Sequence, residues 1–168
     1  MMITTKFKEL MSLNGEMNAA EIESRFTQIA KLLFENFAIQ KGEKIYLFKE
    51  IEFYFYNKHH RDIITHPRFS DSLYWYVNDF GGIDLNFPSE ICKKDGIDST
   101  GKKVDKYILD DSSYFGGILI RQLVSEDKSD ILEGPWACAE LFRLHHALEQ
   151  DNNFPFLVGI CKRNQRSW

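Results

Sequence analysis

The longest β-rich run of the chain, residues 44–57, restricts the fold more than any other segment. It reads KIYLFKEIEFYFYN and alternates apolar and polar residues, as strands in a half-buried sheet do. Its length predicts either one bent strand or the two strands of a hairpin. Glu52 lies inside this run, and an unpaired carboxylate costs free energy wherever water is excluded. Glu52 therefore indicates either a solvated sheet face or a side chain kept for chemistry.

Successive side chains along a strand point to opposite faces, which sorts residues 50–56 into two sets. One set is Glu50, Glu52, Tyr54 and Tyr56, and the other is Ile51, Phe53 and Phe55. If the apolar set lies in the core, Glu52 and Tyr54 share the opposite face. Arg121, in GGILIRQL, is a second charged residue inside a predicted strand. A Glu–Arg pair on neighbouring strands is a common structural feature, and it also holds carboxylates ionised beside bound waters.

A helix is predicted before this strand. Asn18 as N-cap and Glu21 three residues later match a capping box, and apolar residues from Ile22 to Phe37 follow at helical spacing. Lys41 and Gly42 are expected to end this helix.

The remaining segments predict strands, loops and a second helix. Strands are expected at 73–77, 83–87 and 114–125, with a last strand in the tail 152–168. Residues 58–71 are expected to form a loop and residues 78–82 a hairpin turn. A short helix is expected within residues 133–148, starting at Pro135. Helices flanking antiparallel strands define an α+β class, and 168 residues favour a single domain, 1–168. The most polar block, residues 89–113, is predicted to be an insertion that forms an excursion loop or small hairpin with lysines exposed to solvent.

Charge and cysteine content limit the functional classes. The net charge of −4 provides no global electrostatic reason to bind nucleic acid. Three scattered cysteines without a CxxC pair favour reduced thiols in the cytoplasm. No apolar run approaches the roughly 20 residues of a membrane span. The histidines of the 58–71 loop have no spacing on a regular element that predicts a metal centre. The 14% aromatic content fits either a dense core or stacking platforms for planar ligands.

The order of several short motifs resembles the alkyladenine (3-methyladenine) DNA glycosylase family. These motifs are IEFYF, THP, SLYWYVNDFGGIDLNF, YFGGILIRQL and EGPWACAEL, spread over roughly residues 18–145. The ten-residue separation of Tyr76 from Asn86 is similar to that of the family's hairpin. The resemblance implies a compact α+β domain whose curved antiparallel sheet is flanked by helices.

The resemblance also implies roles for individual side chains. Glu52 corresponds to the general base that deprotonates the water attacking the sugar carbon, and Arg121 to the arginine that helps hold that water and the carboxylate. The base-binding pocket would be formed by four further residues. Tyr54 and His66 would pack on one face of the flipped base, and Tyr76 would pack on its other face. Asn86 would lie at the floor of the pocket.

The family inserts a tyrosine from its hairpin turn into the space that the flipped base leaves. Asp79 occupies the corresponding position here, and its neighbour Phe80 is the candidate wedge. The chemistry implied by the resemblance is hydrolysis of the N-glycosidic bond of alkylated purines in damaged DNA, without a metal or cofactor. We expect a monomeric protein that does not contact membranes.

Two alternatives keep the same pocket. In the first, the substrate is a modified nucleoside or a short single strand in place of duplex DNA. In the second, the chain is a purine-binding or interaction module, and the pair of Glu52 and Arg121 is structural.

Overall fold

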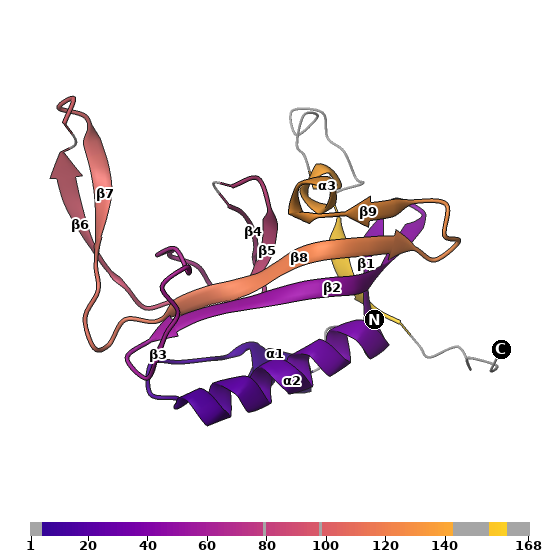
Figure 1. The fold of residues 1–168 in the computed structure, drawn as a ribbon, viewed down its shortest axis with the longest axis horizontal. Coiled ribbons are helices and arrows are strands. Elements are labelled where there is room, and N and C mark those ends of the chain that lie inside the picture. Colours follow the sequence, from indigo (N-terminus) through magenta and orange to yellow (C-terminus); the bar gives the residue numbers. More distant parts are fainter. Residues whose placement is uncertain (1–4, 79, 98, 143–154, 161–168) are drawn as a thin grey trace.

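One antiparallel sheet separates two helices on one face from a third helix on the other (Figure 1). The computed structural model describes residues 5–78, 80–97, 99–142 and 155–160. The elements are α1 (Thr5–Met11), α2 (Ala19–Asn36), β1 (Phe37–Lys41), β2 (Lys44–Asn57), β3 (His60–Arg61), β4 (Trp75–Val77), β5 (Ile83–Asn86), β6 (Cys92–Ile97), β7 (Lys103–Ile108), β8 (Phe115–Ser125), β9 (Ile131–Glu133), α3 (Pro135–Glu140) and β10 (Phe156–Gly159).

The described strands form a main sheet in the order β10-β1-β2-β8-β5-β4. Two short strands extend it, because β3 also pairs with β2 and β9 also pairs with β8. All of these pairings are antiparallel, and the long strands β2 and β8 cross the middle of the sheet (Figure 1). The predicted α+β class and the single domain with a curved antiparallel sheet are confirmed.

An irregularity in β2 decides which side chains face the core. Tyr46 and Phe48 are buried before it, and Phe55 and Asn57 are buried after it. The register with β8 shifts before and after Glu50, which leaves Lys49 of β2 and Arg121 of β8 without a partner in this pairing. One extra, unpaired residue in a strand exchanges the two faces of that strand. Even-numbered side chains therefore face the core before Glu50, whereas beyond it they face the opposite side of the sheet.

Helix α2 covers the core face of the sheet and starts as the sequence predicts. The Asn18 side chain accepts a hydrogen bond from the backbone of Glu21 (3.0 Å), and the Glu21 carboxylate accepts one from the backbone of Asn18 (2.9 Å). This capping box satisfies backbone donors that the first turn leaves without partners. Below it, Ile22, Ile29 and Leu33 are fully buried against the sheet.

The predicted end of this helix, at Lys41 and Gly42, is wrong. Helix α2 ends at Asn36, and β1 begins at Phe37 without an intervening loop. Strand β1 pairs with β2 on one side and with β10 on the other, so strand hydrogen bonds satisfy its backbone. Strand β10 is the last strand predicted in the tail.

Two further predictions need partial correction. The 58–71 segment is mostly loop, as expected, but it contains the short strand β3. The second helix begins at Pro135 as predicted, whereas Glu133 belongs to β9 and Gly134 is the N-cap. Residues 143–148 of the predicted helix lie outside the described residues.

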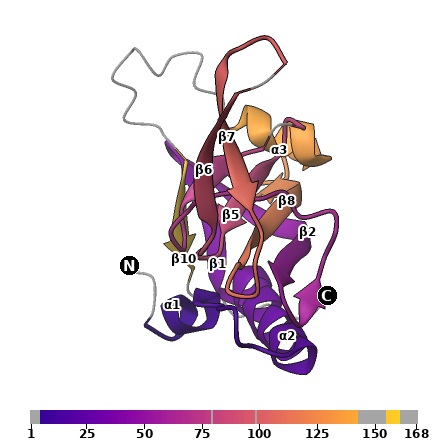
Figure 2. The ribbon, with the colours of Figure 1, turned by 90° about the vertical axis from the view of Figure 1, so that its left-hand side faces the viewer.

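The polar block, residues 89–113, contains the two-stranded sheet β6–β7, which is separate from the main sheet. We call residues 92–108 the arm. Figure 1 shows β6 and β7 standing apart from the main sheet, and in Figure 2 they lie in front of it. Exposed lysines in it are Lys94, Lys102, Lys103 and Lys106. A backbone bridge between Glu90 and Tyr114 joins the base of the arm to the start of β8 (2.8 and 2.9 Å).

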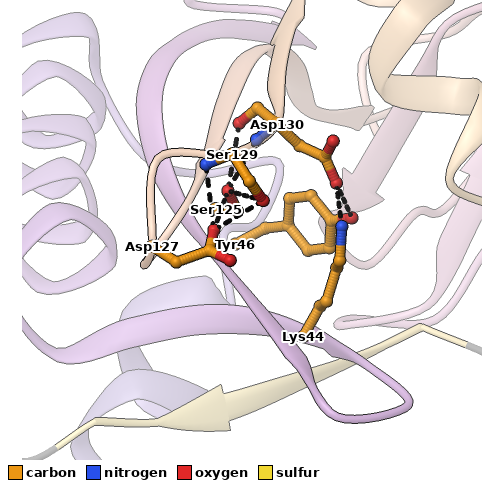
Figure 3. A network of polar contacts seen from close by, with 6 residues as sticks. All are labelled: Lys44, Tyr46, Ser125, Asp127, Ser129 and Asp130. Carbon is orange, nitrogen blue, oxygen red and sulfur yellow. Dashed lines mark hydrogen bonds and ion pairs between the residues drawn. The ribbon is translucent and has the colours of Figure 1, made fainter.

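The turn between β8 and β9 is closed by Asp127 (Figure 3). Its Oδ1 accepts hydrogen bonds from Ser125 Oγ (2.6 Å), Ser129 N (3.0 Å) and Ser129 Oγ (2.8 Å). The hydrogen bond from Ser125 is the largest cause that lowers the Asp127 pKa to about 2, and those from Ser129 add to it. Asp130 then ties the turn to the start of β2 through Lys44 Nζ (2.5 Å).

This turn predicts a defined acid sensitivity. Because the folded pKa of Asp127 is below the unfolded value, its stabilising contribution is complete above about pH 4 and is lost as the pH falls towards about 2. Asp127→Asn should therefore lower the melting temperature at neutral pH and flatten its decline between these pH values. Thermal melts measured by circular dichroism would test this, with the exposed Asp111→Asn as control. Parallel curves for wild type and Asp127→Asn would contradict it.

Candidate functional site

Four strands align a row of side chains on the face opposite α2. Glu52 of β2 pairs with Leu119 of β8, Leu119 pairs with Asp84 of β5, and Asp84 pairs with Tyr76 of β4. Directly paired residues place their side chains on the same face of a sheet. The row therefore extends from a carboxylate on β2 to an aromatic ring on β4.

At one end of this row, Glu52 forms an ion pair with Arg121. Arg121 Nη1 lies 2.5 Å from Glu52 Oε2, and Arg121 Nε lies 3.0 Å from Glu50 Oε1 but without hydrogen-bond geometry. The hydrogen bond to Glu52 is the main cause that raises the Arg121 pKa above its usual value. The side chains of Glu52 and Arg121 remain 37% and 39% exposed. Water can therefore reach a carboxylate that a neighbouring guanidinium holds in place.

Tyr54 contacts Glu52 of this ion pair and belongs to the neighbouring row of paired residues. Burial raises the pKa of the Tyr54 hydroxyl well above its usual range, and a hydrogen bond to the Glu52 carboxylate raises it further. The hydroxyl consequently stays protonated and can donate to Glu52. Tyr54 pairs with Gly117, which pairs with Asn86. A Cβ at Gly117 would lie 3.0 Å from Asn86 Oδ1, so glycine keeps this part of the face open.

A pocket of about 330 Å³ lies over the same face. Aromatic rings and one buried ion pair form much of its wall, and α3 contributes Pro135. These wall residues include Tyr54, His66, Arg68, Tyr76, Phe80 and Asp84. The structure thus brings together three of the four predicted base-binding residues. Glu52 and Arg121 lie beside the wall, next to Tyr54 and Leu119, and do not form part of it.

The polar part of the pocket is a buried network that the sequence analysis did not identify. Arg68 Nη1 forms an ion pair with Asp84 Oδ2 and donates to Asn86 Oδ1 (3.2 Å). Asn78 Nδ2 donates to the second carboxylate oxygen of Asp84 (3.3 Å). The guanidinium carbon of Arg68 lies 4.7 Å from the centre of the Tyr76 ring, a cation–π arrangement. The wall of the pocket therefore contains the hydrogen-bond donors of Arg68 next to the aromatic ring of Tyr76.

This network changes the role expected for Asn86. Asn86 is buried, as a floor residue should be, but its side-chain oxygen already accepts from Arg68. Asp84, like Arg121, is a charged residue inside a predicted strand. The pattern that singled out Arg121 therefore also points to Asp84. Arg68 follows Pro67 in a polar loop, where no periodicity predicts the direction of a side chain.

The tip of the β4–β5 hairpin is held against α3. Asn78 Oδ1 accepts hydrogen bonds from the backbone of Phe80 (3.1 Å) and Gly82 (2.9 Å). Gly81 adopts a φ of 79°, and a Cβ there would lie 2.4 Å from the Trp136 ring. Only glycine accepts both the left-handed backbone and this close contact without strain.

Phe80, the candidate wedge, lies at the rim of the pocket. It is 75% exposed, and its ring centre is 5.0 Å from that of His66. The ring therefore bridges the hairpin tip and the loop that forms the opposite wall. Asp79, at the position of the family's inserted tyrosine, lies outside the described residues.

Two searches of the described residues, one for clusters of metal-ligating side chains and one for membrane-spanning helices, found neither. No group of three or more His, Cys, Asp or Glu side chains there could hold a metal ion. His60 Nδ1 lies 2.8 Å from the Phe55 carbonyl, and His66 contacts Phe80. Among the described helices, none is long and apolar enough to cross a membrane.

Comparison of the chain with protein-family models, curated proteins and solved structures found no match in any of the three. The functional interpretation of the site therefore depends on two sets of observations. One is the geometry around Glu52 and the pocket, and the other is the order of the sequence motifs.

Proposed function

We propose that the chain is a diverged alkyladenine glycosylase that hydrolyses the N-glycosidic bond of alkylated purines in DNA. The observation that supports this best is the position of the ion pair between Glu52 and Arg121 beside a pocket walled by Tyr54, His66 and Tyr76. A base-excising enzyme needs a pocket that stacks on a flipped base and a carboxylate that reaches a water at the sugar. Both features lie on one face of the sheet here.

In the proposed reaction, Glu52 accepts a proton from a water as the water oxygen bonds to the sugar carbon C1′. The bond between C1′ and the base nitrogen breaks, and its electron pair leaves with the base. An alkylated purine carries a positive charge that this electron pair neutralises, so the leaving group needs no strong acid. Arg121 and Tyr54 position the carboxylate through their hydrogen bonds. General-base catalysis of this kind contributes roughly 10²–10⁴-fold to the rate.

The pocket fits a small planar ligand. Its volume is at the lower end of the range for small-molecule sites, and its aromatic walls suit stacking. The buried Arg68 adds hydrogen-bond donors, and Asp84 balances its charge. In this proposal a base lies against the Tyr54 and His66 side of the pocket, with its acceptor atoms towards Arg68.

The direct test is base release by the wild-type protein. Methylated duplex and methylated single-stranded DNA would be incubated with the protein in EDTA, and free bases would be counted by chromatography. We expect release of 3-methyladenine or a related lesion, since a water activated by Glu52 requires no metal in this mechanism. Absence of release from both substrates by folded protein would contradict the proposal.

A second candidate keeps the pocket and changes the substrate to a single strand or a nucleoside. The contact of Phe80 with His66 favours it, because entry of the ring into a duplex would break this contact. The net charge of −4 favours it too. Release from single strands alone in the same assay would select this candidate. Purine binding without hydrolysis would instead indicate the binding module.

A further inference from the structure

Two lysines of the arm stand opposite each other. The register pairs Lys94 of β6 with Lys106 of β7, so the two exposed side chains share one face. Like charges in directly opposite positions destabilise an antiparallel pair, and an isolated hairpin is marginal in water. Asp95 follows Lys94 in β6 and therefore lies on the other face, where it does not separate the two lysines. An anion between the lysines would remove their repulsion.

Gly96 shapes the same face of the arm. A Cβ at Gly96 would lie 2.7 Å from both Cγ and Cδ of Lys106, so the lysine stem lies across this glycine. Glycine inside a strand weakens it and commonly marks a place where another backbone approaches closely. This face of the arm therefore carries two lysine cations beside a position that has no side chain.

The arm is anchored beside the pocket. Ser89, near its base, accepts a hydrogen bond from the Ser70 backbone (2.7 Å) and donates one to the Ser70 carbonyl (3.0 Å). Ser70 belongs to the same loop as the pocket residues His66 and Arg68. Both ribbon views show the arm rising on the side of the sheet that carries α3 (Figures 1 and 2). A chain that delivers a base to the pocket would pass near the arm.

The charge of the arm is opposite to that of the whole chain. Residues 92–108 contain five lysines and three aspartates, while the net charge of the chain is −4. A local positive strip on an acidic chain fits a narrow polyanion better than it fits a broad surface.

We infer that the arm binds the phosphodiester backbone of the DNA strand whose base enters the pocket, with Lys94 and Lys106 as its phosphate contacts. This inference rests on the proposed function for its substrate, a base within a polynucleotide. Its test does not depend on the reaction, because binding to undamaged DNA requires no bond cleavage.

The experiment measures fluorescence anisotropy of labelled, undamaged single-stranded and duplex oligonucleotides over a series of salt concentrations. The variant K94Q/K106Q is compared with wild type and with K8Q/K31Q, which removes two exposed lysines from α1 and α2 on the opposite face of the sheet. Loss of two phosphate contacts should reduce the slope of log affinity against log salt by about 1.4 for single strands or about 1.8 for duplex.

The possible outcomes distinguish DNA binding by the arm from base release at the pocket. We expect K8Q/K31Q to keep the wild-type slope, K94E/K106E to weaken binding further than K94Q/K106Q, and circular dichroism to show that all variants are folded. A wild-type slope for K94Q/K106Q would overturn the inference, even if alkylated bases are released. Binding of poly-glutamate but of neither oligonucleotide would also overturn it and indicate an acidic protein partner. If DNA binding depends on the arm but no base is released, the result would support DNA binding by the arm and contradict only the proposed hydrolysis.

Discussion

Glu52→Gln should lower the release of alkylated bases by roughly a hundredfold or more. Glutamine keeps the shape of the side chain and its reach towards Arg121 and Tyr54, but it cannot accept a proton from water. The fold should persist, because the Glu52 side chain is 37% exposed and does not leave a fully buried charge behind. Circular dichroism and single-turnover base release, measured on the same preparations, would separate chemistry from folding.

Glu50→Gln is the matched control for this variant. Glu50 lies on the same strand, contacts the same arginine and carries the same charge, but it is more exposed and lies farther along β2 from Tyr54. If the carboxylate of Glu52 is the base, only Glu52→Gln should lose most of the activity. Equal losses in both variants would mean that the charge around Arg121 matters and that no single carboxylate activates the water.

Local patterns explain why the sequence predicted much of this fold. The capping box at Asn18 and Glu21 requires only residues three positions apart. The strand over residues 44–57 follows from alternation and β-rich composition. By contrast, Phe37 and Ile39 suit either a helix that continues from Leu33 or an alternating strand. Pairing of β1 with β2 and β10 decides between them, and such long-range contacts leave no local pattern.

The same distinction applies to the candidate site. Alternation correctly placed Glu52 and Tyr54 on one face, because both lie beyond the register shift at Glu50. Extending that alternation back to Tyr46 would have assigned the wrong face, since nothing in the sequence marks the shift. Arg68 reaches the pocket through the path of a loop, so residue spacing could not predict it.

Arg68→Met should have the largest effect on stability, about 3–5 kcal/mol. The side chains of Arg68 and Asp84 are only 5% and 2% exposed. Without the guanidinium, Asp84 keeps the hydrogen bond from Asn78 but remains as a buried carboxylate without an ionic partner. Tyr76 also loses the cation over its ring. Urea denaturation would measure the loss, with the exposed Arg61→Met as control, for which a change within about 0.5 kcal/mol is expected.

A double variant, Arg68→Met with Asp84→Leu, isolates the ion pair. Replacing both partners with apolar side chains is often close to neutral, whereas removing one is costly. The double variant should therefore recover much of the stability that Arg68→Met loses. Equal stability of Arg68→Met and Arg61→Met would show instead that the pair carries little of the folding energy.

The same double variant distinguishes a structural role of Arg68 from a role in binding the base. If the pair only supports the fold, base release should recover together with stability. If Arg68 donates hydrogen bonds to the acceptor atoms of the base, a folded double variant still lacks those donors. Its KM should then rise while Glu52 and Arg121 continue to catalyse the bond cleavage at a similar kcat. Steady-state rates measured at the temperature where wild type and double variant are both fully folded would decide between the two roles.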